Sequence, residues 1–157
     1  MRPKLYIETS VISYLVARPS KDLLMAAHQQ VTQDWWNQRR AQFDVYVSSL
    51  VIQEASQGDA QAAASRLNTL QDIPLLELRN EARDLAEQFI RYKALPKKAN
   101  EDSLHIAIAT IYGLDYLLTW NCKHIANAEI QKRIAKISVE QGYDMPIICT
   151  PLELMGE

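Results

Sequence analysis

At 157 residues, the chain is close to the commonest size of one folded domain and long enough to bury a core. Apolar residues make up 48% and charged residues 23%, both ordinary for a soluble globular protein, so we expect a single domain over residues 1–157. A formal net charge of −2 argues against a protein whose whole surface binds polyanions. It does not exclude a nucleic-acid enzyme that uses a few local Lys and Arg side chains.

The sequence predicts neither a membrane span nor a disulfide. Its longest apolar stretch, residues 106–111, is far too short to cross a bilayer, and the start of the chain lacks the long apolar run of a secretory signal. Cys122 and Cys149 form no CxxC pair and have no clustered histidines nearby. We therefore expect a cytoplasmic protein in which both cysteines are ordinary reduced residues.

Strands and helices are predicted to alternate along the chain. The predicted strands are residues 4–8, 43–48, 73–78, 116–119 and 145–149. The predicted helices are residues 9–15, 22–41, 49–56, 59–71, 82–95, 100–112 and 123–139, the last with a break near 126–127. Ser48 or Ser49, Asp59 and Asn100 are the expected helix caps. This order indicates an α/β protein, a three-layer α/β/α sandwich around a central, mostly parallel sheet.

Three acidic residues fall where such a sheet would place its ligands, outside the carboxyl ends of the strands. Glu8 ends the first strand, Glu54 lies in the helix after the second, and Asp102 opens the helix before the fourth. Each has an ordinary structural explanation, as a strand-end charge, a surface charge or a helix-dipole partner. If they converge, however, two carboxylates about 4 Å apart repel by roughly 4 kcal/mol at an effective dielectric near 20. A hard divalent cation, Mg²⁺ or Mn²⁺, would offset that repulsion and suits phosphodiester hydrolysis.

Polar residues near these acids are weaker candidates. Asn121 and Lys123 follow the fourth strand, and Lys97 and Lys98 precede the helix of Asp102. A turn Asn and solvated Lys side chains are the ordinary reading, whereas the functional reading is a polar group beside the metal with cations that attract phosphate. Trp120 is a candidate for stacking on a base. His105, one helical turn after Asp102, is predicted to be a hydrogen-bonded rim residue rather than a ligand.

Four segments resemble, in order, motifs of the PIN-domain family, which includes the VapC-type toxins of bacterial toxin–antitoxin pairs. They are residues 6–11, 48–54, 102–107 and 115–124. The resemblance spans residues 4 to about 150 and implies a Mg²⁺- or Mn²⁺-dependent ribonuclease of α/β/α fold. The positions that match the catalytic set are Glu8, Glu54, Asp102 and Asn121, the first three as metal ligands. The chain departs from the family at Glu8, where Asp is usual.

The resemblance also implies substrate contacts and partners. Ser10 matches a hydroxyl near the metal, and Lys98, Thr119 and Lys123 are the other expected substrate-binding residues. RNA is the expected substrate, a small antitoxin protein a possible partner, and homodimerisation is expected, with the helix that carries Trp35 and Trp36 as the candidate surface.

Other functions stay open or are disfavoured. A catalytically weak or inactive PIN-like module that binds RNA or protein is the alternative, because Glu8 and the neutral Asn121 both weaken the expected metal site. A nucleotide-binding Rossmann-like enzyme is disfavoured, since none of the four glycines forms a Gly-rich phosphate loop after a strand. A serine or cysteine hydrolase is disfavoured by the lack of a nucleophile elbow.

Overall fold

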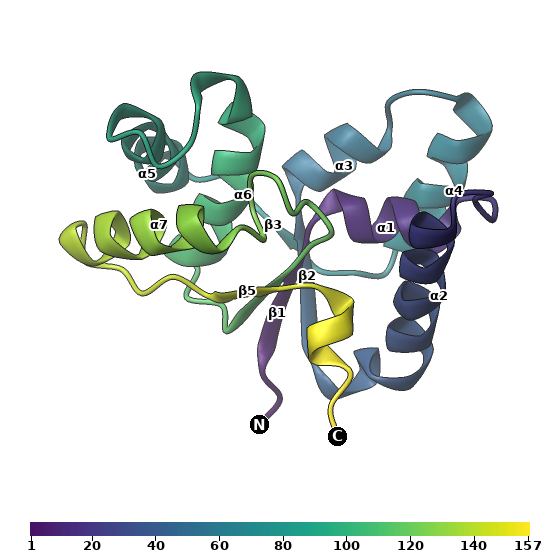
Figure 1. Cartoon of the computed structure of the whole chain (residues 1–157). Coiled ribbons are helices and arrows are strands. Elements are labelled where there is room, and N and C mark those ends of the chain that lie inside the picture. The colour runs from purple at the N-terminus through teal and green to yellow at the C-terminus, as the bar shows by residue number, and fades with distance from the viewer.

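The computed structural model describes residues 1–157 and contains a central sheet of five strands (Figure 1). The strands lie in the order β3-β2-β1-β4-β5, and each pair of neighbours is parallel. Their bounds are β1 (Lys4–Ile7), β2 (Asp44–Ser48), β3 (Leu75–Leu76), β4 (Tyr116–Leu118) and β5 (Ile147–Cys149). The mostly parallel sheet predicted from the sequence is confirmed, and it is parallel throughout.

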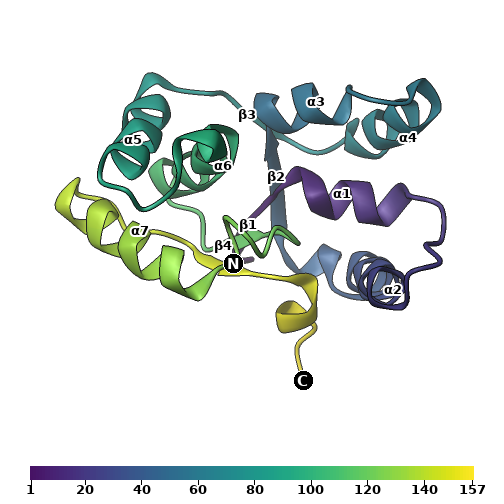
Figure 2. The same cartoon turned by 45° about the horizontal axis from the view of Figure 1, so that its top comes forward.

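Helices cover both faces of this sheet. Figures 1 and 2 show α1 to α4 on one side of the strands and α5 to α7 on the other. The first layer contains α1 (Thr9–Val16), α2 (Leu23–Gln38), α3 (Ser49–Ala55) and α4 (Ala60–Leu70). The second contains α5 (Asn80–Arg91), α6 (Asn100–Ile111) and α7 (Ala128–Glu140). Three short 3-10 helices complete the chain: η1 (Arg40–Gln42), η2 (Lys97–Ala99) and η3 (Pro151–Leu154). The three-layer α/β/α sandwich is confirmed.

Side-chain caps set the start of several helices, and those at Ser48 and Asp59 lie where the sequence predicts them. The Asp22 carboxylate accepts from the Met25 amide at 2.9 Å, and Asp59 accepts from the Ala62 amide at 3.0 Å. Of the two serines after β2, Ser48 is the cap and accepts from the Val51 amide at 3.4 Å. These bonds satisfy amides that the first helical turn leaves without a partner. The cap on Ser48 also fixes the direction of α3, which carries Glu54.

Other helix ends differ from the prediction. The helix predicted to reach residue 95 ends at Arg91, because Lys93 adopts a left-handed conformation with φ of 61° and the Ala94 amide bonds back to Phe89. Asn100 is not a cap but the first residue of α6, since η2 leads directly into that helix.

The helix predicted to begin at residue 123 begins later. The chain forms turns after β4, and the Asn127 side chain then accepts from the amides of Glu129 and Ile130, each at 3.1 Å, so α7 starts at Ala128. The predicted break near 126–127 is therefore the true helix start. Strand β3 is also shorter than predicted and contains only Leu75 and Leu76.

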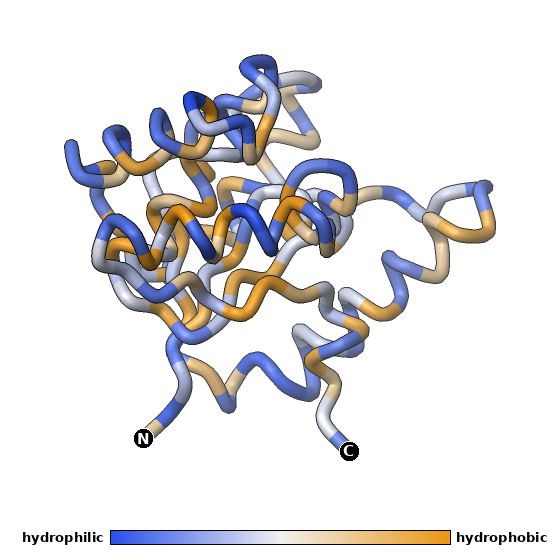
Figure 3. The backbone as a smooth tube through the Cα atoms, turned by 60° about the vertical axis from the view of Figure 1, so that its left-hand side comes forward, coloured by the Kyte–Doolittle hydropathy of each residue, from blue (hydrophilic) through white to orange (hydrophobic).

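The core lies along the central strands and against α6. Tyr6, Ile7, Leu117 and Leu118 are fully buried, and 34 buried residues form one continuous apolar cluster. Figure 3 shows hydrophobic and hydrophilic residues alternating along the helices, as expected where one face packs on the sheet. No helix is both long enough and apolar enough to span a membrane. Because parallel strands end together, the carboxyl ends of β1, β2 and β4 meet along one edge.

Candidate metal centre at the carboxyl edge

Two of the three predicted acids meet at this edge, together with a histidine. Oxygen atoms of Glu8 and Glu54 and a ring nitrogen of His105 all lie within 4.8 Å of one another. Glu8 follows β1 directly, Glu54 lies in α3 and His105 lies in α6, so three separate elements converge. The sequence predicts this meeting of Glu8 with Glu54. It does not predict that His105 belongs to the cluster.

Glu8 is a buried carboxylate with hydroxyl neighbours. Only 6% of the residue is exposed, and its Oε1 accepts from Thr119 at 2.6 Å and from Ser10. The Ser10 hydroxyl also accepts from the Trp120 amide at 2.8 Å, which ties the loop after β4 to α1. Ser10 and Thr119, both predicted as substrate-binding residues, therefore hold the Glu8 carboxylate in this structure. Neither hydroxyl neutralises its charge.

Glu54 is held by His105 and by a buried network behind it. His105 is fully buried, and its Nε2 lies 2.7 Å from Glu54 Oε1. A carboxylate only accepts hydrogen bonds, so Nε2 carries the proton. On the other side of the ring, His105 Nδ1 lies 2.6 Å from the Tyr6 hydroxyl, which lies 2.8 Å from Ser48 Oγ. Thr9 donates a further hydrogen bond to Glu54 at 2.5 Å.

This network shifts several pKa values. Burial alone would raise the pKa of Glu54, but the hydrogen bond and charge of His105, with the Thr9 hydroxyl, lower it to about 2. Burial lowers the pKa of His105, yet the bond to Glu54 and the charges of Glu8, Glu54 and Asp102 raise it overall. Burial raises the pKa of Tyr6 well above its usual value, so its hydroxyl remains a donor. The Glu54–His105 contact is therefore an ion pair over a wide pH range.

Asp102 has a different set of partners. Its Oδ1 accepts from the side-chain amide of Asn121 at 3.0 Å, and its Oδ2 lies 3.1 Å from His124 Nδ1. The side-chain oxygen of Asn121 accepts from the backbone amide of His124 at 3.0 Å. The backbone amide of Asn121 donates to Thr119 Oγ1 at 2.9 Å. Because Thr119 also donates to Glu8, a chain of hydrogen bonds links Asp102 to Glu8. Asp102 is not among the three residues within 4.8 Å, but it is connected to them.

Of the remaining charged residues near this edge, one acid lies beside the cluster and two lysines contact no carboxylate. A side-chain hydrogen bond with Glu54 is the main reason that the pKa of Glu101 is raised. Glu101 therefore lies beside the cluster. Lys98 on η2 and Lys123 after β4 are exposed, and neither lies within 4.0 Å of a carboxylate. Besides His105, sequence reasoning missed four contributors to the site: Tyr6, Thr9, Glu101 and His124. Their signal is weak, since each is an ordinary residue for its element.

Two aromatic predictions need correction. Trp120 is buried, with its ring stacked on His28 at 4.1 Å and its Nε1 donating to Thr32 at 2.7 Å, so its faces are not free for a base. Trp35 is fully buried against Phe43, with ring centroids 5.8 Å apart, and is not part of a docking surface. In both cases the large ring fills space between a helix and a loop or strand end.

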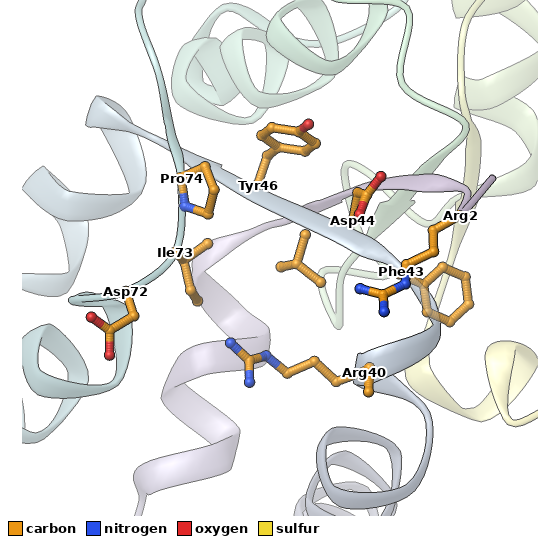
Figure 4. Close-up of a pocket in the computed structure, with 10 residues that line it drawn as sticks. Arg2, Arg40, Phe43, Asp44, Tyr46, Asp72, Ile73 and Pro74 are labelled. Atoms are coloured by element: carbon orange, nitrogen blue, oxygen red, sulfur yellow. The ribbon is translucent and has the colours of Figure 1, made fainter.

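A cavity with charged walls lies at the opposite, amino-terminal edge of the sheet. It has a volume of about 340 Å³ and is lined mainly by the segments before β2 and β3. Figure 4 shows the guanidinium groups of Arg2 and Arg40 in this pocket and the carboxyl groups of Asp44 and Asp72 at its sides. Because it holds residues of both signs and lies away from the converging acids, we do not assign the chemistry to it.

The donor set at the carboxyl edge fits a hard divalent ion. Its carboxylates have hydroxyl, amide and histidine partners, and the contacts within 4.0 Å between a carboxylate and a basic side chain involve only His105 and His124. Glu54 is paired with His105, but the buried Glu8 carboxylate has only hydroxyl partners and retains a negative charge, which a cation would relieve. Carboxylate oxygens are the ligands that Mg²⁺ and Mn²⁺ prefer. Glu8, Glu54 and Asp102 are the residues that would hold such an ion.

Comparison with known proteins assigns the fold. No family model and no curated protein matches the sequence. Among solved structures, VapBC2 from Rickettsia felis, bound to a DNA fragment from its promoter, matches with a TM-score of 0.60 and 15% identity over 93% of this chain and 97% of that one. VapC20 from Mycobacterium tuberculosis, a Sarcin-Ricin loop cleaving toxin, matches with a TM-score of 0.55 and 15% identity over 77% and 92%. The chain therefore has a VapC-like PIN fold, as the sequence motifs predict.

Proposed function

We propose that the protein is a metal-dependent endoribonuclease that hydrolyses RNA phosphodiester bonds, in the manner of a toxin from a toxin–antitoxin pair. One observation carries the proposal: in a VapC-like PIN fold, Glu8 and Glu54 converge at the carboxyl edge of the sheet, and Asp102 is linked to them through Asn121 and Thr119. The single unit that performs this function is residues 1–157, which share one apolar core.

The residues have distinct roles in this proposal. Glu8, Glu54 and Asp102 would hold Mg²⁺ or Mn²⁺, and a bound ion would supply charge stabilisation at the phosphate and a more acidic water. Ser10 and Thr119 fix the Glu8 carboxylate through their hydroxyl groups. Asn121 and His124 orient the two oxygens of Asp102.

The exposed cations attract the RNA. Lys98 lies on η2, just before the helix of Asp102, and Lys123 lies two residues after Asn121. Each cation that neutralises a phosphate releases counterions, so RNA binding should weaken as salt rises. A net charge of −2 makes these local cations the main source of attraction.

The test is cleavage of a labelled single-stranded RNA with Mg²⁺, with Mn²⁺ and with EDTA. We expect cleavage with either ion, none with EDTA, and loss of cleavage in Asp102→Asn. The matched control is Asp44→Asn, which neutralises a carboxylate at the opposite edge of the sheet and should cleave as the wild type does. Cleavage by Asp102→Asn at the wild-type rate would show that the activity belongs to another site or a contaminant.

Two partner proposals go with this function, and the fold likeness to VapBC2 supports the first of them. We propose a small antitoxin protein that inhibits the nuclease, and a homodimer as the working state. Because Trp35 is buried, the dimer surface must use other residues. Light scattering of the purified chain tests the dimer, and a monomer at micromolar concentration would contradict it.

A non-catalytic PIN-like module is the second candidate, and one observation favours it. Glu8 already accepts two hydroxyl bonds, and Glu54 already forms an ion pair with His105, so both acids have partners without a metal. Mn²⁺ titration followed by heat, repeated on Asp102→Asn, separates the two candidates. Tight binding that the substitution weakens supports the nuclease, whereas no heat in either protein supports the module.

A further inference from the structure

Three aromatic rings from three different segments meet beside the acidic cluster. Tyr14 lies on α1, His28 on α2, and Trp120 in the loop after β4. The centroids of His28 and Trp120 are 4.1 Å apart with planes 15° apart, and those of Tyr14 and Trp120 are 5.9 Å apart with planes 13° apart. Tyr14 and His28 are 6.4 Å apart with planes 25° apart. The three rings are therefore nearly parallel.

Tyr14 and His28 both pack with nearly parallel planes against Trp120, whose indole is buried. The two partly exposed rings also lie close to each other, with centroids 6.4 Å apart. Tyr14 and His28 are partly exposed, and neither side chain forms a hydrogen bond within the protein.

Hydrogen bonds fix this aromatic layer next to the acids. The Trp120 amide donates to Ser10 at 2.8 Å, and its ring nitrogen donates to Thr32 at 2.7 Å. The preceding residue, Thr119, donates to Glu8 at 2.6 Å. Tyr14 follows Ser10 by one helical turn, so the two side chains share a face of α1. The layer thus adjoins the site where the proposed metal would hold a phosphate.

We propose that Tyr14 and His28 form a platform that stacks an unpaired nucleobase of the RNA substrate. This inference rests on the proposed function, since the phosphate next to that base would lie at the acidic cluster. Every base has an aromatic face, so stacking on a platform needs no sequence-specific hydrogen bond. A base is free to stack in this way only where the strand is unpaired, so the ligand is single-stranded RNA or a loop.

Abasic RNA tests the platform directly. Binding of a short, labelled single-stranded RNA with a nuclease-resistant backbone to the full-length protein is measured with Mn²⁺, together with a series in which one base at a time is missing. For the wild type, we expect removal of the base at one position to weaken binding about tenfold. For the double variant Tyr14→Leu with His28→Leu, the intact RNA should bind about tenfold more weakly, and removal of that base should have no further effect.

Two further variants separate stacking from other effects. Tyr14→Phe keeps the ring and should bind as the wild type does, whereas loss of binding in Tyr14→Phe would assign the effect to the hydroxyl and overturn the platform. Tyr92→Leu removes an aromatic ring that is 59% exposed in the other helical layer and should change nothing. Far-ultraviolet circular dichroism and thermal unfolding report whether each variant keeps the fold.

The outcomes distinguish this inference from the proposed function. If the double variant is folded and binds every RNA as tightly as the wild type, the platform is wrong while metal-dependent cleavage stands. If the platform variants instead lose binding of a protein partner but not of RNA, the surface serves that partner and the inference is overturned. If the wild type neither binds nor cleaves RNA, both proposals are wrong.

Discussion

The two edges of the sheet use charge in opposite ways. At the amino-terminal edge, Arg2 and Arg40 share a pocket with Asp44 and Asp72, so charges of both signs lie together (Figure 4). At the carboxyl edge, Glu8 and Glu54 lie within 4.8 Å of His105, with no Lys or Arg in contact. The amino-terminal pocket contains basic and acidic side chains together, whereas the Glu8 carboxylate at the carboxyl edge has only hydroxyl partners for its charge.

This difference explains why we place the functional site at the carboxyl edge and not in the amino-terminal pocket. Formation of the carboxyl-edge cluster costs electrostatic energy. A histidine, two threonines and a serine orient its two glutamates through hydrogen bonds. The amino-terminal pocket has no comparable network, and Arg40 Nε there is buried without a hydrogen-bond partner. Sites that are organised at an energetic cost are more often functional than sites that are merely concave.

The largest expected effect comes from neutralising Glu8. With excess Mn²⁺, the wild type should gain stability by mass action, ~2.7 kcal/mol at a hundredfold excess over Kd, and Glu8→Gln should lose most of that gain. In EDTA the same substitution should stabilise the protein by roughly 1–3 kcal/mol, because it removes a buried charge beside Glu54. Thermal unfolding with and without Mn²⁺ measures both effects, and Asp44→Asn should show neither. A Glu8→Gln protein with undiminished stabilisation by Mn²⁺ would remove the contrast between the edges.

The next effect concerns His105, which we regard as a positioning residue for Glu54. His105→Ala should weaken Mn²⁺ binding by about 10–100-fold, because outer partners of metal ligands orient those ligands. His105→Gln retains a side-chain N–H that can reach Glu54 and should recover part of the affinity. Titration of Mn²⁺ by calorimetry compares the two variants. Equal affinity in His105→Ala and the wild type would mean that Glu54 needs no orientation.

The Glu54–His105 pair also predicts a pH window of stability for the metal-free protein. The pKa of Glu54 is lowered from 4.5 to about 2, so its stabilising contribution is present above pH 4.5 and is lost as pH falls. The pKa of His105 is raised above 6.5, so its contribution is present below pH 6.5 and is lost as pH rises through the raised value. Both contributions are present between pH 4.5 and 6.5.

Urea unfolding in EDTA measures that window. The difference in unfolding free energy between the wild type and His105→Gln should be largest between pH 4.5 and 6.5 and should shrink on both sides. Asp44→Asn serves as the control, since a substitution at the other edge should give a constant difference across the range. A flat profile for His105→Gln would show that the pair is not ionised as described.

Several features could be predicted from the sequence because they follow from local rules. The order of strands and helices comes from periodicity, and the meeting of Glu8 with Glu54 comes from the rule that parallel strands end at a common edge. The caps at Asp22, Ser48 and Asp59 lie where short polar residues precede apolar periodicity.

Other features depend on tertiary contacts that a single sequence does not display. The place of His105 in the cluster follows from the rotation of α6 against β1, which brings its ring between Tyr6 and Glu54. Trp120 stands in a loop that looks exposed in sequence, yet α2 covers its ring with His28. The early end of α5 depends on the left-handed backbone of Lys93, a conformation that Lys rarely adopts.

The smallest expected effect concerns Ser48, which connects the end of β2 to Tyr6 on β1. Ser48 caps α3 and also contacts the Tyr6 hydroxyl, so it joins the helix of Glu54 to the network behind His105. Ser48→Ala should destabilise the protein by about 1 kcal/mol through loss of the cap, and it should weaken Mn²⁺ binding less than His105→Ala does. Asp59→Ala removes a comparable cap from α4 and should lower stability alike without any effect on the metal. If both variants leave Mn²⁺ binding unchanged, the Ser48 cap contributes to stability alone. Glu54 would then be oriented by His105 and Tyr6, without a contribution from Ser48.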